Sequence, residues 1–225
     1  MTGSVTEAVV FDLDGVIVDS EHVWDAAREA LALERGGRWH ENAQRDMMGM
    51  SSLEWSRYMH DVIGLEDPPE EISAEVVRRL EKIYRDELPL IEGAPEAVAR
   101  LAERWPLGVA SSSNRQIIDL VLELADLGRY FRATVSSEEV PRGKPAPDVY
   151  LEAARRLGAD PRKCAAVEDS HNGILSARAA GMFVVAIPNA RYPPGEEALA
   201  AADVEIRSIT GLTPELIEEG AGTRW

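Results

Sequence analysis

An apolar run that ends in two closely spaced carboxylates constrains this chain more than any other stretch. Val9, Val10 and Phe11 are typical of a buried strand, and Asp12 and Asp14 come directly after them. Because side chains of a strand repeat with a period of two, both carboxylates leave the chain on the same side. Two anions roughly 5 Å apart repel by about 3 kcal/mol at an effective dielectric near 20. The pair therefore indicates a bound cation, a shared proton, or a reaction in which the two carboxyls alternate.

Further along the chain, short apolar segments alternate with segments of helical periodicity. The expected strands cover residues 5–11, 107–110, 133–136, 164–167, 182–187 and 202–206, and the helices between them cover 95–104, 115–124, 148–157 and 170–180. Such alternation is typical of a parallel sheet with helices on both faces. The sequence therefore predicts an α/β fold built on a Rossmann-like parallel sheet.

The segment after the first motif has a different character. Between residues 20 and 91 we find no pattern of a strand, and helices are expected at 21–34, 41–47, 53–63 and 73–88. Ser20 is the expected N-cap of the first helix, Gly49 an expected break, and Pro68-Pro69 an expected linker. The predicted division is a core of residues 1–19 and 92–225 with a helical insert of residues 20–91.

Polar side chains gather where the predicted strands end. Besides the first two aspartates, these are Ser111, Lys144 on a loop, Glu168 and Asp169. Ligands of open parallel sheets bind beyond the carboxyl ends of the strands, so these groups are expected at one edge. Four carboxylates with hard oxygen ligands suit Mg²⁺. One carboxylate can then act as a nucleophile, while a lysine, a serine hydroxyl and the amides that open helix 115–124 stabilise a transferring phosphoryl group.

Composition narrows the partners. The 225 residues carry a formal net charge of -16, which makes nucleic acid and an anionic membrane surface poor partners. Cys164 is the single cysteine and falls in an apolar strand, so we expect an inert thiol buried in the core. We find no signal peptide and no apolar run long enough to span a membrane, and a cytoplasmic, monomeric protein is expected.

These motifs resemble those of the haloacid dehalogenase superfamily over nearly the whole chain. The first motif is the run from Phe11 to Ser20, the second is Ala110-Ser111, the third is Gly143-Lys144-Pro145, and the fourth runs from Val167 to Gly173 with Ala179-Ala180-Gly181-Met182. The helical insert resembles the cap of the group of phosphoglycolate phosphatases, sugar phosphatases and beta-phosphoglucomutases. The resemblance implies that hinges near residues 15–20 and 91–93 let the insert close over the site.

The resemblance also implies roles for single residues. Asp12 would be the nucleophile and a metal ligand, and Asp14 the general acid and then base, with its backbone carbonyl on Mg²⁺. Glu168 and Asp169 would complete the metal site. The phosphoryl group would be held by Ser111, Ser112 and Lys144, and further substrate contacts are expected from His22, Ser113, Asn114 and Arg115. Trp24, Met47, Met48, Met50 and Trp55 are expected to pack inside the insert, with one or two of them lining the pocket.

Three functions follow from this pattern. The first is a Mg²⁺-dependent phosphatase that acts on a small phosphorylated metabolite, such as a sugar phosphate, through an aspartyl phosphate. The second is a hexose phosphomutase, against which Trp24, Met48 and Ser52 argue, because the mutase has cationic side chains at these positions; Arg45, Arg57 or Arg115 could substitute for them. The third is a binding protein without catalysis on the same scaffold. The sequence does not name the substrate.

Overall fold

The computed structural model describes residues 6–48 and 50–222 and has an α/β fold with a parallel sheet. Six strands of the described chain are ordered β3-β2-β1-β4-β5-β6. Their bounds are β1 Ala8–Phe11, β2 Leu107–Ser111, β3 Phe131–Ser136, β4 Cys164–Glu168, β5 Phe183–Ala186 and β6 Val204–Glu205. The predicted fold class is therefore confirmed, and β1 lies in the middle of the sheet. Val5, the expected start of β1, and Gly49, the expected break, lie outside the described residues.

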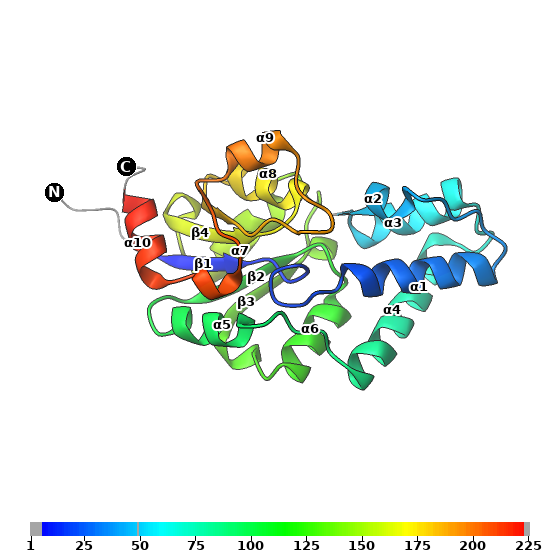
Figure 1. Cartoon of the computed structure of the whole chain (residues 1–225), viewed down its shortest axis with the longest axis horizontal. Coiled ribbons are helices and arrows are strands. Elements are labelled where there is room, and N and C mark those ends of the chain that lie inside the picture. Colours follow the sequence, from blue (N-terminus) through cyan, green and yellow to red (C-terminus); the bar gives the residue numbers. More distant parts are fainter. Residues whose placement is uncertain (1–5, 49, 223–225) are drawn as a thin grey trace.

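Helices cover both faces of the sheet because successive side chains of a strand point to opposite sides. Val9 and Phe11 belong to a core cluster shared with α5 Ala94–Ala102, α6 Arg115–Leu124 and α10 Pro214–Gly222. Ala8 and Val10 belong to a second cluster with α7 Asp148–Leu157, α8 His171–Ala179 and α9 Glu196–Ala201. Figure 1 shows α8 and α9 on one side of the sheet, with α5 and α6 on the other. The alternation of apolar residues in β1 thus fixes a three-layered core.

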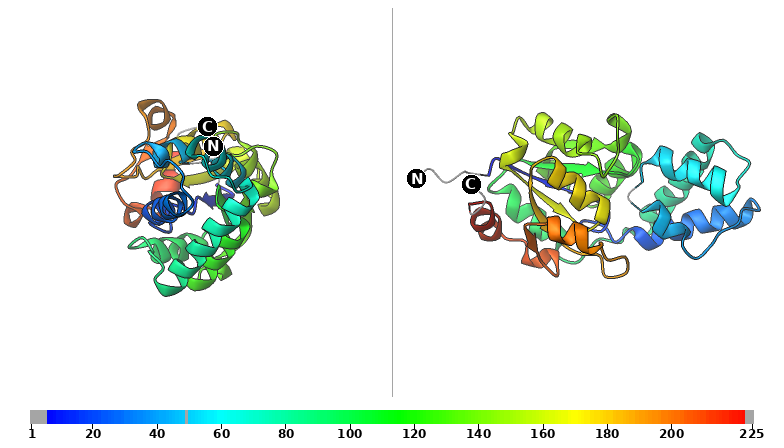
Figure 2. Two further views of the ribbon diagram at one scale, coloured as in Figure 1. Left: turned by 90° about the vertical axis from the view of Figure 1, so that its right-hand side faces the viewer. Right: turned by 90° about the horizontal axis from the view of Figure 1, so that it is seen from above.

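The helical insert lies beyond the carboxyl ends of the strands. It consists of α1 Glu21–Glu34, α2 Ala43–Met47, α3 Ser52–Tyr58, the π-helix Met59–Ile63 and α4 Pro69–Asp86. The front view in Figure 1 and the view from above in Figure 2 agree that the insert stands apart from the sheet on one side. None of the helices in the described residues has the length and apolarity that a membrane crossing requires.

Two chain crossings join the insert to the core, and they lie side by side. The backbone N–H of Asp19 donates to Pro89 O at 2.8 Å, and that of Ile91 donates to Ile17 O at 3.0 Å. Paired backbone groups of this kind hold the two connections together. We propose that the boundaries 19/20 and 91/92 and the hinges of the insert fall at these paired segments.

The structure differs from the prediction in several local features. Pro69 is the first residue of α4, which begins four residues before the expected start at 73, because a proline without an N–H fits a first helical turn. Ser20 stands at the N-cap position of α1 without a side-chain capping bond, since its hydroxyl donates to Asp14 instead. The helices α9 and α10 are absent from the sequence-based prediction.

Candidate active site

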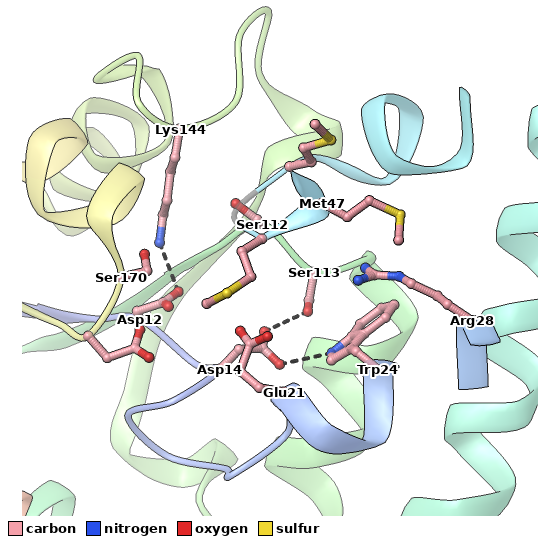
Figure 3. Close-up of a pocket in the computed structure, with 13 residues that line it drawn as sticks. Asp12, Asp14, Glu21, Trp24, Arg28, Met47, Ser112, Ser113, Lys144 and Ser170 are labelled. Carbon is pink, nitrogen blue, oxygen red and sulfur yellow. Dashed lines mark hydrogen bonds and ion pairs between the residues drawn. The ribbon is translucent and has the colours of Figure 1, made fainter. Parts of the chain in front are cut away.

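The carboxyl ends of two neighbouring strands bring three acidic side chains together. Asp12 follows β1, while Glu168 ends β4 and is followed by Asp169. Each of the three can offer one oxygen atom such that all of these atoms lie within 4.8 Å of one another, and all three residues are buried. Figure 3 shows Asp12 and Lys144 pointing toward each other at this edge of the sheet. The predicted gathering of these sequence-distant motifs is therefore confirmed.

Lys144 lies between two of these carboxylates. Its Nζ is 2.8 Å from Asp12 Oδ1 and 2.5 Å from Glu168 Oε1, and the side chain is buried. Burial alone would lower the pKa of Lys144, but the charges of Asp12 and Glu168 outweigh it and raise that pKa. Burial raises the pKa of Asp12 well above its ordinary value, Glu168 adds to this rise, and Lys144 opposes it. The two carboxylates thus favour the charged form of the lysine beside Asp12.

Glu168 is saturated with hydrogen bonds. Besides Lys144, Oε1 accepts from the Tyr150 hydroxyl at 2.8 Å. Its Oε2 accepts from the backbone N–H of Asp169 at 3.1 Å and from both the N–H and the hydroxyl of Ser170, at 3.2 Å and 3.1 Å. A fully buried carboxylate with this many donors is a fixed part of the scaffold. Glu168 therefore holds the lysine and the turn before α8 in place.

The carboxylate of Asp169 has fewer hydrogen-bond partners than that of Glu168. Its Oδ2 accepts from Asn189 Nδ2 at 3.3 Å, but its buried Oδ1 has no hydrogen-bond partner among the described residues. Burial, followed by the charges of Glu168 and Asp12, raises the pKa of Asp169 well above its ordinary value. An orphaned carboxylate oxygen next to two further carboxylates fits a hard divalent cation. The residues present therefore fit a metal ion with oxygen ligands.

Gly15 lets the first motif approach Asp169. A Cβ at this position would lie 1.9 Å from Asp169 Oδ2, and the glycine has φ of +78°. Only glycine combines that backbone conformation with so close an approach at low cost. The glycine after the second aspartate of the motif thus belongs to the geometry of the acidic cluster.

The carboxylate of Asp14 faces the helical insert and has partners of its own. It accepts hydrogen bonds from Ser20 Oγ at 2.5 Å, Trp24 Nε1 at 3.2 Å, Ser111 Oγ at 3.3 Å and Ser113 Oγ at 2.6 Å. Asp12 and Asp14 both line one pocket, as the period-two pattern predicts. Their hydrogen-bonding partners differ, however, so each carboxylate has its own local environment (Figure 3).

The second motif contributes to the same pocket. Ser112 and Ser113 line it, whereas Ser111 is fully buried behind it and accepts from the N–H of Ser113 at 3.0 Å. Ser111 at the end of β2 thus connects the strand to Asp14. Ser112, Ser113 and Lys144 are predicted contact residues that the structure places at the pocket.

Three predicted substrate residues do not line this pocket, although Asn114 shares a neighbouring hollow with Lys144 and His22 shares another with Glu21. The guanidinium of Arg115 binds Asp119 at 3.0 Å and also binds Glu139, which directs it along the core surface. Asn114 Nδ2 donates to Glu138 Oε1 at 2.8 Å, and His22 is exposed with its Nδ1 3.9 Å from Asp19 Oδ1. None of the three is among the described residues that line the pocket. They were predicted because they lie at or near the starts of helices, but their side chains contact acidic residues outside this pocket.

Other lining residues were missed by the sequence-based prediction. Glu21, Arg28 and Ser170 line the pocket, and Trp24, Met47, Met48 and Met50 do so as well, which is more of the apolar set than expected. Glu21, Trp24 and Arg28 are spaced by three and seven residues, so they share one face of α1. That spacing could have identified them, since Trp24 belongs to the set of which one or two members were expected to line the pocket.

A model of the haloacid dehalogenase-like hydrolases matches residues 6–181. The chain belongs to this family. The predicted membership is therefore confirmed, and the four motifs described above lie within or at the end of the matched range, apart from Met182.

Related haloacid dehalogenase-like proteins include several phosphatases. Hexitol phosphatase B of Escherichia coli (strain K12) is 34% identical over 227 aligned residues, covering 92% of this chain and 94% of that protein. The phosphorylated carbohydrates phosphatase of Thermotoga maritima is 30% identical, covering 78% of this chain and 82% of that protein.

Solved structures share the fold. Beta-phosphoglucomutase from Clostridium difficile has a TM-score of 0.83 at 23% identity and covers 97% of this chain and 98% of that one. CbbY from Rhodobacter sphaeroides, in complex with phosphate, has a TM-score of 0.81 at 24% identity and covers 92% of this chain and 96% of that one. At these identities the likeness shows a shared fold and carries no statement about function.

Proposed function

We propose that this chain is a Mg²⁺-dependent phosphatase that hydrolyses a small phosphorylated metabolite, namely a sugar or polyol phosphate. The observation that carries the proposal is the buried carboxylate of Asp12, held beside the Lys144 ammonium at 2.8 Å in a pocket that the helical insert covers. The names of the two phosphatase relatives support the reaction type and the substrate class.

Mg²⁺ would be held by Asp12, Asp169 and the backbone carbonyl of Asp14, with Glu168 in support. The orphaned Oδ1 of Asp169 supports this assignment. When bound, the ion would neutralise charge on the carboxylates and on the phosphoryl oxygens. Carboxylates that repel one another would become a favourable ligand set around a divalent cation.

The chemistry of the side chains proceeds in two steps. A carboxylate oxygen of Asp12 attacks phosphorus, the bond from phosphorus to the ester oxygen breaks, and the protonated carboxyl of Asp14 gives its proton to the leaving oxygen. A water molecule then attacks the aspartyl phosphate while Asp14 takes a proton from it. The bond from phosphorus to Asp12 breaks, and inorganic phosphate is released.

The neighbours of the two aspartates suit these steps. The Lys144 ammonium stabilises negative charge on the phosphoryl oxygens, and Ser112 lines the pocket close to the N-terminal end of α6. Ser111 and Ser113 direct their hydroxyls at Asp14 Oδ2, at 3.3 Å and 2.6 Å. We infer that Ser111 acts through Asp14 and that Ser112 contacts the phosphoryl group.

The alternative of a mutase requires cations that hold a second phosphate. Ser52 donates to Glu138 at 2.8 Å, and Arg115 is bound to acidic side chains of the core. Arg45 and Arg57 are not among the described residues that line the pocket. Arg28 does line it, but Glu21 lies beside it in the same wall and offsets its charge. These observations favour hydrolysis over transfer back to a sugar.

The experiment measures inorganic phosphate released from a panel of sugar, polyol and aryl phosphates, with Mg²⁺ and with EDTA. We expect turnover that depends on Mg²⁺ and falls by at least about a thousandfold in Asp12→Asn. Asp86→Asn is the matched control, because Asp86 is exposed at the end of α4, and its activity should equal that of the wild type. Full turnover by Asp12→Asn would refute the assignment.

A soluble small molecule is the proposed partner, and neither nucleic acid nor a membrane is proposed. The monomeric state and the cytoplasmic location stay predictions, which sedimentation and cell fractionation test. The third function, binding without catalysis, predicts a protein that releases no phosphate from any member of the panel.

A further inference from the structure

The helical insert presents a polar triad to the pocket, formed by Glu21, Arg28 and Gln44. Glu21 and Arg28 lie two turns apart on α1, and both line the pocket together with Asp14 (Figure 3). Gln44 of α2 connects them. Its Nε2 donates to Glu21 Oε2 at 2.9 Å, and its Oε1 accepts from Arg28 Nη1 at 3.2 Å. The three side chains therefore form one hydrogen-bonded unit.

Arg28 is a buried cation that has hydrogen-bonding capacity left over. Its residue is 6% exposed, and its guanidinium carbon lies 4.7 Å from the ring centroids of both Trp24 and Trp55. Its Nε has no hydrogen-bond partner among the described residues. Figure 3 shows the guanidinium end directed toward the pocket. A buried donor without a partner costs stability, so this nitrogen is available to a water molecule or a ligand.

We propose that this triad recognises hydroxyl groups of the substrate's leaving group. The carboxyl of Glu21 binds hydroxyls, and the guanidinium of Arg28 donates a hydrogen bond to a hydroxyl oxygen. The inference rests on the proposed phosphatase function and narrows its substrate to the monophosphate of an uncharged polyol or sugar. It makes Glu21 and Arg28 specificity-determining residues, while the chemistry stays with Asp12 and Asp14.

Charge balance favours an uncharged leaving group. Among the described residues that line the pocket, the insert contributes one carboxyl, Glu21, and one cation, Arg28. Their charges offset each other when Glu21 is ionised, and the carboxylate of Asp14 offsets Arg28 when Glu21 is protonated. Asp14 lies on the same side of the pocket and adds negative charge. A second phosphate or a carboxylate on the leaving group would face Glu21 and Asp14 without an excess of positive charge to bind it. Hydroxyls, which both donate and accept, match the mixed set.

The titration of Glu21 is consistent with this role. Burial, followed by the charge of Asp14, raises the pKa of Glu21 to about 7, whereas Arg28 and Gln44 oppose that rise. A carboxyl that titrates near neutrality exists in both forms there, so it can accept a hydrogen bond from a hydroxyl or donate one to it. The side chains of Met47, Met48 and Met50 complete the wall and offer apolar contact to the carbon skeleton.

The test compares two substrates of different leaving group. Sorbitol 6-phosphate carries the hydroxyls that the triad would bind, and p-nitrophenyl phosphate carries none of them. For each enzyme the ratio of kcat/KM for the two substrates is measured. We expect the ratio to fall about tenfold to a hundredfold in Arg28→Met and in Glu21→Gln, mainly through a higher KM for sorbitol 6-phosphate.

Two variants keep the test decisive if one of them fails to fold. Arg28→Met retains an unbranched side chain between Trp24 and Trp55, and Glu21→Gln keeps the shape of the half-buried carboxyl. Glu29→Gln is the matched control, because Glu29 is exposed on the same helix, and its ratio should equal that of the wild type.

The outcomes separate this inference from the proposed function. Wild-type protein that releases phosphate from neither ester refutes the phosphatase function itself. Wild-type turnover with an unchanged ratio in both variants refutes the role of the triad and leaves the phosphatase function standing. A wild-type preference for 2-phosphoglycolate over sorbitol 6-phosphate also overturns the inference, because that leaving group is anionic.

Discussion

Replacing Gly173 with alanine should destabilise the protein, although alanine is the better helix former. Gly173 is the third residue of α8, and its N–H donates to the capping hydroxyl of Ser170 at 3.1 Å. A Cβ at this position would lie 1.9 Å from Glu168 Oε1 and 2.1 Å from Glu168 Oε2. The carboxylate would have to move, and its position is fixed by Lys144, Tyr150 and the turn before α8.

The two opposing effects differ in size. Alanine in place of glycine stabilises a helix by at most about 1 kcal/mol. Displacing the buried carboxylate of Glu168 breaks its ion pair with Lys144, and the loss of one partner from such a pair costs about 3–5 kcal/mol. The free energy of unfolding should therefore fall by about 2–4 kcal/mol in Gly173→Ala.

Urea denaturation followed by circular dichroism measures this difference. Gly211→Ala is the matched control, because a Cβ at Gly211 would meet no atom within 4 Å and the variant should unfold like the wild type. Phosphatase activity should fall as well, since Lys144 loses one of its two partners. Wild-type stability or better in Gly173→Ala would refute the fixed position of Glu168.

Three further changes test other contacts. Lys144→Met leaves the buried carboxylates of Asp12 and Glu168 without their cation, so the free energy of unfolding should fall by about 3–5 kcal/mol in urea denaturation. A loss below about 1 kcal/mol would contradict the ion pairs. Ser52→Ala removes the 2.8 Å hydrogen bond from the insert to Glu138 of the core, so amide hydrogen exchange in residues 52–58 should become faster. Unchanged exchange would show that this bond does not hold the insert against the core. Burial raises the pKa of Cys164 to about 12, so the thiol stays protonated at pH 8. A thiol reagent should therefore label the urea-unfolded chain but not the native protein, and rapid labelling of the native protein would contradict the burial of Cys164.

The core could be predicted from sequence because local and long-range signals agree there. The run Ala8–Phe11 is apolar on both faces, which only a central parallel strand requires, and its register with β2 and β4 brings Asp12 next to Glu168. Glycines and a basic loop mark the same edge. Each motif alone is a weak signal, and the motifs become specific together because the parallel sheet dictates that they meet.

The helical insert was less predictable, for two physical reasons. A proline pair resembles a linker, yet Pro69 fits the first turn of α4, so the sequence pattern misplaced that helix start. The direction of a side chain at a helix start depends on partners distant in sequence: Arg115 turns to Glu139 and Asn114 to Glu138. These partners could not be paired without the structure.

The helical period predicts that Glu21 and Arg28 share a helix face, but it does not predict which face meets the pocket. Their seven-residue spacing places them on one face of α1, but which face looks into the pocket depends on how α1 packs against α4 and the core. The link through Gln44 of α2 joins segments whose relative placement no local pattern encodes. The polar triad is therefore a property of the folded insert.

Trapping the covalent intermediate tests the role of Asp12 most directly. The enzyme is mixed with Mg²⁺ and sorbitol 6-phosphate and quenched in acid within one turnover. The protein is then digested, and the masses of its peptides are measured by mass spectrometry. We expect one phosphoryl group on the peptide that contains Asp12, and none on the same peptide of Asp12→Asn. A phosphoryl group on a different residue, or phosphate release by a wild-type enzyme that never carries one, would contradict nucleophilic catalysis by Asp12.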